Sequence, residues 1–141
     1  MFVFYMEVVT VKRVFITFSL FLLSTIFLTA CGPASNGDES AVAVQAYLNA
    51  LVNKDSAALS TLSCKDWEAQ ATMELDSFQA VKTELENLAC KKTGSEGDMD
   101  VVTCTGKINA TYNNENMQID LSKRPFLVKR QGSDWQVCGY K

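Results

Sequence analysis

An uncharged apolar run near the start of the chain, Val14 to Leu28, limits what the rest of the chain can fold into. The positive pair Lys12 and Arg13 precedes the run and small residues close it, as in a secretory signal peptide. The run has 15 residues, and a membrane-spanning helix needs about 20. We therefore expect residues 1–30 to be removed on export, which leaves 111 of 141 residues, enough for one domain.

The residues at the end of this run form a recognisable pattern. Leu28, Thr29, Ala30 and Cys31 give an apolar residue, two small residues and a cysteine. This pattern resembles the lipobox of bacterial lipoproteins. The resemblance implies that the thiol of Cys31 carries diacylglycerol and that a signal peptidase cuts between Ala30 and Cys31. Two acyl chains hold a protein stably at a membrane. We expect this lipid to be the chain's one covalent addition and expect no cofactor.

The composition after the predicted cleavage site excludes some partners. Residues 31–40 are small and polar, which predicts a flexible tether, and residues 41–141 then form a single domain. The mature chain holds 11 basic and 15 acidic residues, a net charge of −4. Because no basic stripe is present, we expect neither nucleic-acid binding nor adsorption to anionic lipid.

Four cysteines follow Cys31, namely Cys64, Cys90, Cys104 and Cys138. An even number of cysteines in a small exported domain predicts two disulfides, for which three pairings exist. A zinc site is the alternative, but the chain has no histidine and no closely spaced pair of cysteines. We therefore expect disulfides and no metal.

Three segments show the spacing of a helix. Apolar residues recur at i, i+3, i+4, i+7 and i+8 between Ala41 and Asn53, and Asp38 or Ser40 can cap this helix. Asp55 can cap a short second helix. We expect Asp66 to cap a third, whose apolar positions are Trp67, Ala71, Leu75 and Phe78.

The second half of the chain is typical of strands. Residues 82–92 fit a helix or a strand, and the turn residues at 94–98 favour a strand. Residues 101–112 alternate in polarity. A third strand is expected to begin at 117–121 and to pass a bulge or edge position at Pro125 before 126–128, and 135–140 form the last strand. Helices followed by strands predict an α+β domain, with two to three N-terminal helices on a four-stranded antiparallel meander.

This order resembles the cystatin-like, cone-shaped fold of the nuclear transport factor 2 superfamily, to which small exported proteins belong. The resemblance rests on the opening helix with Tyr47 and Leu48, the segment 53–55 that begins the next helix, and the closing strand with Trp135 and Val137. It spans most of residues 40–141. It implies a cone-shaped domain in which the helices cover one face of the antiparallel sheet.

The meander also bears on the disulfides. One strand would separate Cys104 from Cys138, a spacing of about 9.5 Å, and bridged Cα atoms lie within about 7 Å. Cys90 and Cys104 lie symmetrically about Gly97, so a hairpin would bring them together. We therefore expect the pairs Cys90–Cys104 and Cys64–Cys138.

The sequence offers no complete catalytic constellation. Without histidine, the serine and cysteine triads and histidine metal sites are excluded. The superfamily's enzymes can use an aspartate base with a tyrosine donor, which would implicate Glu74, Asp76, Asp66 or Glu68 with Tyr47 in an isomerase or dehydratase. The interpretation that we favour is that Asp66 is a cap, that Glu74 and Asp76 are solvated and that Tyr47 belongs to the core.

Aromatic residues provide the remaining candidates for a site. Those that could line a ligand cavity are Tyr47, Trp67, Phe78, Tyr112, Phe126 and Trp135. Each falls on the apolar face of its element, so a core role is the simpler interpretation. We expect a noncatalytic binding or interaction module outside the cytoplasm, with a protein or small apolar ligand as partner. A structural envelope protein and a pocket enzyme are the alternatives.

Overall fold

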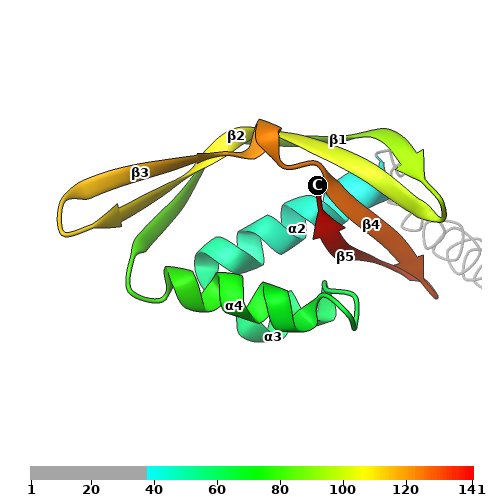
Figure 1. Cartoon of the computed structure of the whole chain (residues 1–141), viewed down its shortest axis with the longest axis horizontal. Helices are drawn as coiled ribbons and strands as arrows, with labels where there is room; N and C mark the ends of the chain where they lie inside the picture. The colour runs from blue at the N-terminus through cyan, green and yellow to red at the C-terminus, as the bar shows by residue number, and fades with distance from the viewer. Residues whose placement is uncertain (1–37) are drawn as a thin grey trace, which may run out of the picture. The chain divides into compact units, whose positions relative to one another are not determined.

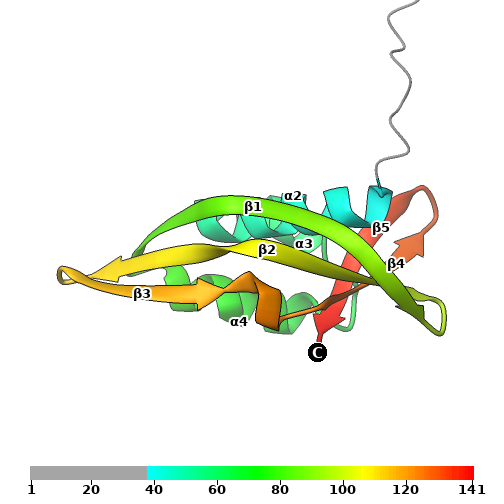
Figure 2. The same cartoon turned by 90° about the horizontal axis from the view of Figure 1, so that it is seen from above.

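A computed structural model describes residues 38–141. Three helices come first: α2 (Glu39–Asn53), α3 (Ser56–Thr61) and α4 (Glu68–Phe78). Five strands follow, in one antiparallel sheet with the helices packed on it (Figures 1 and 2): β1 (Lys82–Glu96), β2 (Met99–Tyr112), β3 (Glu115–Asp120), β4 (Phe126–Gln131) and β5 (Asp134–Tyr140). The predicted α+β class is confirmed. The leader, Ala30 and Cys31 lie outside the described residues.

The long helix α2 provides most of the helical contribution to the core. Its positions with apolar spacing are buried: Val44, Tyr47, Leu48, Leu51 and Val52. Asp38 occupies the N-cap position, but its carboxylate accepts hydrogen bonds from the Ser40 hydroxyl (2.7 Å) and the Lys92 amide instead of capping the helix. Lys54 ends α2 in the left-handed conformation at φ +58°, and its ammonium donates to the Val81 carbonyl (2.8 Å).

The two shorter helices begin differently. Asp55 caps α3 as predicted, accepting a hydrogen bond from the Ala58 amide (3.0 Å). The prediction that Asp66 caps α4 is wrong, since Trp67 occupies that position without a side-chain hydrogen bond. The amides of Trp67 and Glu68 both donate to the Cys64 carbonyl (2.9 and 3.0 Å). The turn before α4 therefore satisfies these amides with backbone, and no side-chain acceptor is needed.

Strand β2 is the centre of the sheet. It pairs with β1 along its length through a hairpin that turns at Gly97 and Asp98. On its other edge, its first part (Asp100 to Val102) pairs with β4 and its last part (Lys107 to Tyr112) pairs with β3. The sheet order is β1-β2-β4-β5, with β3 off this path. The sheet thus has five strands where four were expected, because the short 3-10 helix η2 (Leu121–Lys123) and Pro125 separate β3 from β4.

A bulge divides the long β1–β2 hairpin. The register shifts between Glu86 and Ala89, where Asn87 has φ +55°, and the opposite residue Gly106 has φ +97°. A Cβ atom on Gly106 would lie 2.5 Å from the Glu86 carbonyl oxygen. Bulges of this kind bend and twist a strand pair, and Figure 2 shows β1 and β2 arching over the helices.

Two disulfides connect distant parts of the domain. Cys90 and Cys104 are direct partners across β1 and β2, and Cys64, between α3 and α4, is bonded to Cys138 in β5. This is the predicted pairing. Disulfides persist in oxidising surroundings, which indicates a location outside the cytoplasm. Within residues 38–141 no helix combines the length and apolar character that crossing a membrane requires.

Candidate functional site

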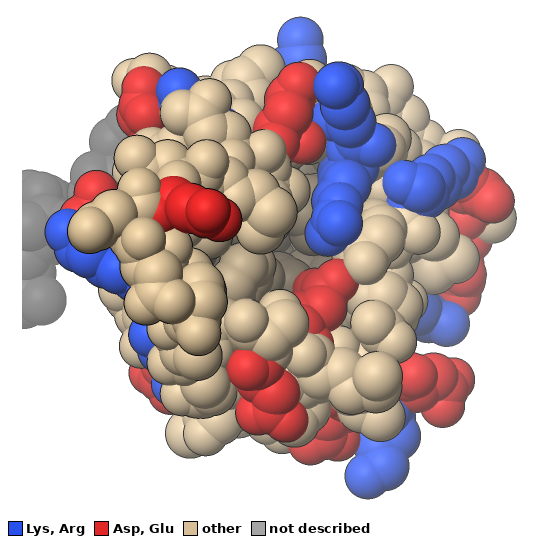
Figure 3. All heavy atoms as spheres, turned by 60° about the vertical axis from the view of Figure 1, so that its left-hand side comes forward, with Lys and Arg blue, Asp and Glu red and all other residues tan. Residues whose placement is uncertain are grey.

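A cavity of about 250 Å³ lies between the helices and the half of the sheet formed by β2 and β3. Its apolar lining comes from α2, α4 and the sheet, and includes Leu48, Leu51, Phe78, Ile108, Ala110 and Ile119. Figure 3 brings this side of the molecule forward and shows a hollow near its centre, with uncharged atoms around most of the rim. The site is therefore an apolar pocket with an opening to solvent.

Three polar side chains meet at one part of the cavity. The Tyr140 hydroxyl, from β5, donates to Glu74 Oε1 (2.7 Å), and the Tyr47 hydroxyl, from α2, donates to Glu74 Oε2 (3.3 Å). Glu74 lies in α4, and its side chain is 14% exposed. Each oxygen of the Glu74 carboxylate thus accepts a hydrogen bond from a tyrosine hydroxyl.

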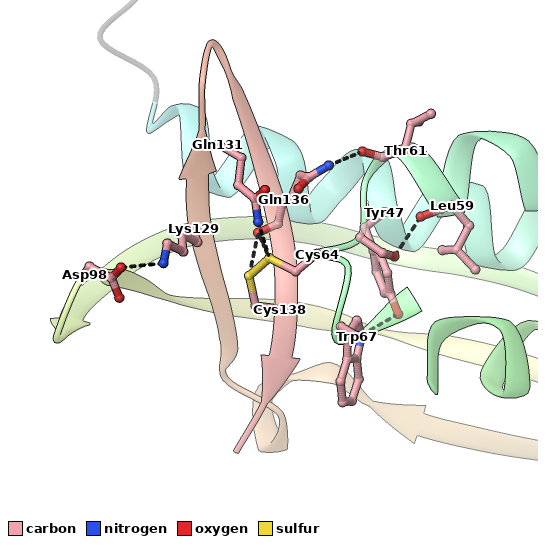
Figure 4. Close-up of a disulfide and its surroundings, with 11 residues drawn as sticks. Tyr47, Leu59, Thr61, Cys64, Trp67, Asp98, Lys129, Gln131, Gln136 and Cys138 are labelled. Carbon is pink, nitrogen blue, oxygen red and sulfur yellow. Dashed lines mark hydrogen bonds and ion pairs between the residues drawn. A yellow bond between two sulfur atoms is a disulfide. The ribbon is translucent and has the colours of Figure 1, made fainter. Parts of the chain in front are cut away.

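The aromatic residues around this cluster hold it in place. Trp67 Nε1 donates to the Tyr47 hydroxyl (3.2 Å), and the Trp67 ring packs edge-on against the Tyr140 ring with centroids 5.3 Å apart. Figure 4 shows the Trp67 side chain directed at Tyr47. Along the chain, Trp67 follows Cys64 of the Cys64–Cys138 disulfide by three residues. The Cys64 amide also donates to the Val137 carbonyl (2.8 Å). The disulfide and this backbone contact fix the turn from which Trp67 extends.

The pKa values of both tyrosines are raised. Burial raises the pKa of Tyr47 most, and the charge of Glu74 raises it further. For Tyr140 the largest cause of the raised pKa is its hydrogen bond to Glu74. Both phenols therefore stay protonated at neutral pH and act as hydrogen-bond donors.

One basic side chain, Arg124, borders the cavity between η2 and β4. Its Nη1 atom lies 3.8 Å from Glu74 Oε1, and its guanidinium lies over the Tyr140 ring, 4.8 Å from the centroid. Its side chain is 44% exposed. Among the described residues no hydrogen bond from the guanidinium to a protein acceptor is present, so its N–H donors keep capacity for a further acceptor.

The structure brings some of the predicted aromatic residues together and places others apart. Tyr47, Phe78 and Phe126 line the cavity, and Trp67 contacts Tyr47 from outside it. Tyr112 lies exposed at the end of β2. Trp135 lies on β5, where its Nε1 donates to Glu39 Oε2 (3.1 Å), away from the cavity.

The sequence did not indicate Tyr140 and Arg124 as residues of the site, and the prediction that Glu74 is solvated is wrong. A signal for Glu74 was present, since it lies three residues after Ala71 and four before Phe78, on the buried stripe of α4. Asp76, by contrast, is exposed. Tyr140 and Arg124 gave no local signal, because only the folded sheet brings them to α4.

Comparisons with family models, with curated proteins and with solved structures find no match. Within residues 38–141 no group of three or more acidic or cysteine side chains is placed to hold a metal ion.

Proposed function

We propose that this protein is an exported lipoprotein whose domain binds a small apolar molecule in the cavity without transforming it. The observation that carries the proposal is the cavity, which combines an apolar lining with a few converging polar groups. Ligand sites have this composition. Its volume of about 250 Å³ is several times the roughly 30 Å³ that one water molecule occupies in the liquid. An apolar space of this size is better filled by an organic molecule than by ordered water.

Binding is favoured over catalysis by the state of Glu74. A general base needs an oxygen within hydrogen-bond reach of the substrate. Both oxygens of Glu74 already accept hydrogen bonds from Tyr47 and Tyr140. An isomerase or dehydratase, which the likeness of the element order to the nuclear transport factor 2 superfamily suggests, is the second candidate. The Glu74 carboxylate and the Tyr47 hydroxyl do lie together. Turnover of a bound molecule by the wild type that is lost in Glu74→Gln would therefore favour the enzyme.

The lipid anchor is the second part of the proposal. The disulfides support an extracytoplasmic site, and the pattern Leu28, Thr29, Ala30, Cys31 supports lipidation. Cys31→Ser should leave an unprocessed precursor that incorporates no labelled fatty acid. Normal processing and labelling of this variant would exclude the anchor.

Binding can be tested with a neutral dye whose fluorescence rises in apolar surroundings. A suitable sample is the whole mature chain, residues 31–141, with Cys31→Ser to leave it without acyl chains. It contains every described element, the buried core and both disulfides. We expect saturable dye binding.

A matched pair of variants locates the bound dye. Ala110 is buried on the cavity side of β2, so Ala110→Phe should fill the space and abolish binding. Thr105, in the same strand, is exposed, and Thr105→Phe should leave binding intact. Equal binding by wild type and Ala110→Phe would place the dye elsewhere and overturn the proposal.

A further inference from the structure

The apolar wall of the cavity continues beyond it along the β2–β3 hairpin. Across this ladder Ile108 pairs with Ile119 and Ala110 pairs with Met117. Because side chains alternate between the faces of a sheet, Tyr112 falls on the face of Ile108 and Ala110. We call these five residues the hairpin stripe. Ile108 and Ala110 are buried, whereas Met117 and Tyr112 are 59% and 56% exposed. Met117 still borders the cavity, and Tyr112 lies beyond its lining. The stripe begins inside the cavity and ends in solvent.

The length of the hairpin stripe argues for an elongated ligand. Figures 1 and 2 show the hairpin extending past the ends of α2 and α4. From Ile108, which lines the cavity, to Tyr112, which lies outside its lining, β2 advances four residues, or about 14 Å at roughly 3.4 Å per residue. A compact molecule cannot cover this distance. A linear apolar chain can, and it would cover side chains that are otherwise exposed.

The polar end of the ligand is inferred from Arg124, which is ion-paired with Glu74 but makes no side-chain hydrogen bond within the described residues. Glu74, Tyr47 and Tyr140 satisfy one another, and the Ser77 hydroxyl donates to the Glu74 carbonyl (2.6 Å). Among these cavity residues, Arg124 is the one whose N–H groups lie near a carboxylate only at ion-pair distance, 3.8 Å from Glu74, and they keep hydrogen-bonding capacity for a second acceptor. A guanidinium binds a carboxylate through two parallel hydrogen bonds.

The position of Arg124 favours such a contact. Glu74 and the Tyr140 ring hold the guanidinium at the cavity, which lowers the entropy lost on binding. Its partial exposure also leaves a bound carboxylate partly hydrated, so that the desolvation cost remains small.

We propose that the ligand is a single-chain amphiphile with a terminal carboxylate, which Arg124 binds while the apolar chain follows the hairpin stripe toward Tyr112. This inference rests on the proposed function, since it names the class of molecule that the cavity takes. It predicts two separate preferences, one for the carboxylate head and one for a long chain.

Both preferences can be tested by displacement of the neutral dye from the mature chain, residues 31–141 with Cys31→Ser. Dodecanoate, dodecanol and dodecyltrimethylammonium share one chain and differ in the head group. A charged hydrogen-bonded contact contributes about 1.5–3 kcal/mol, so dodecanoate should displace the dye at a concentration roughly tenfold or more below that of dodecanol. Hexanoate, which is too short for the hairpin stripe, should compete far more weakly. Equal competition by dodecanoate and dodecanol, or by dodecanoate and hexanoate, would overturn the inference.

Two variants assign the head-group preference to Arg124. Arg124→Gln should abolish the preference for dodecanoate over dodecanol, and because both competitors are compared on the same variant, a change in its affinity for the dye does not affect the result. Arg130 is exposed on β4 and lies outside the cavity lining, so Arg130→Gln should keep the preference. A preference that survives Arg124→Gln would refute the role of Arg124. The proposed function would fail separately, through absence of dye binding or through binding that Ala110→Phe does not reduce.

Discussion

Tyr140, in the last strand, donates a 2.7 Å hydrogen bond to Glu74, which lies 66 residues earlier in α4. This contact joins the end of the chain to the helical layer at the cavity. Tyr47, in α2, donates a second hydrogen bond to Glu74, so that the side chains of α2 and β5 both bind one carboxylate of α4.

Removal of the Tyr140 hydroxyl should destabilise the domain measurably. Tyr140→Phe leaves Glu74 Oε1 without its shortest hydrogen bond, and losing a bond to a charged, mostly buried group costs about 1.5–3 kcal/mol. Urea unfolding followed by circular dichroism measures the change. Tyr112→Phe is the control, since Tyr112 is exposed and should lose almost nothing. Similar stabilities of the two variants would mean that the contact contributes nothing.

The stability of the domain should fall at alkaline pH. The folded state raises the pKa of Tyr47, so the folded chain holds this proton more tightly than the unfolded chain does. The resulting stabilisation is fully present below the unfolded-state pKa of about 10 and is lost as the pH rises above it. Urea unfolding between about pH 9 and pH 11 should show this decline. In Tyr47→Phe the decline should be shallower, and an unchanged slope would contradict the burial of this phenol.

Gly106 should be intolerant of a side chain. A Cβ atom there would meet the Glu86 carbonyl oxygen at 2.5 Å, and the backbone has φ +97°. Strain of this kind costs on the order of 1–3 kcal/mol, so Gly106→Ala should lower the free energy of unfolding by at least that much. Gly94 has open space around it, and Gly94→Ala is the matched control, with little expected change. Equal effects at both positions would show that the bulge tolerates a Cβ atom.

The two aspartates near the helix starts should differ. Asp55→Ala removes a side-chain cap and should cost about 1 kcal/mol. Asp66→Ala should leave stability unchanged, because the backbone carbonyl of Cys64 accepts from the first amides of α4. Thermal unfolding of both variants compares them, and a larger loss for Asp66→Ala would reverse the assignment.

Peptide mapping without reduction should recover two linked pairs, Cys90 with Cys104 and Cys64 with Cys138. In the chain-entropy model, the 15-residue loop of the first pair contributes about 3 kcal/mol and the 75-residue loop of the second about 4.5 kcal/mol. Replacing Cys64 and Cys138 with alanine should therefore destabilise the domain more than replacing the other pair. A fragment linking Cys64 to Cys90 would contradict the structure.

Local patterns were sufficient to predict the elements themselves. The spacing of apolar residues in α2 and the alternation in β2 each reflect one buried face, which a sequence records directly. The symmetric placement of Cys90 and Cys104 about Gly97 likewise recorded the hairpin register. Features that depend on one element and its immediate neighbours were therefore accessible.

Features that depend on the packing of distant elements were not. Both β3 and β4 pair with one edge of β2, which depends on how η2 redirects the chain, and the sequence suggested four strands instead. Tyr140 and Arg124 reach Glu74 because β5 and the η2 segment end beside α4 in space. Nothing in the neighbouring residues of either indicates that meeting.

The partition of β2 by the bulge at Gly106 has a consequence for how this protein can change over evolutionary time. Before the bulge, β2 holds Cys104 and pairs with β4; after it, β2 pairs with β3 and forms the cavity wall. Substitutions in the second part would alter the shape of the cavity without disturbing the first part, which the disulfide braces. If the cavity binds a ligand as proposed, one scaffold could thereby acquire new ligand preferences while its stability is maintained elsewhere.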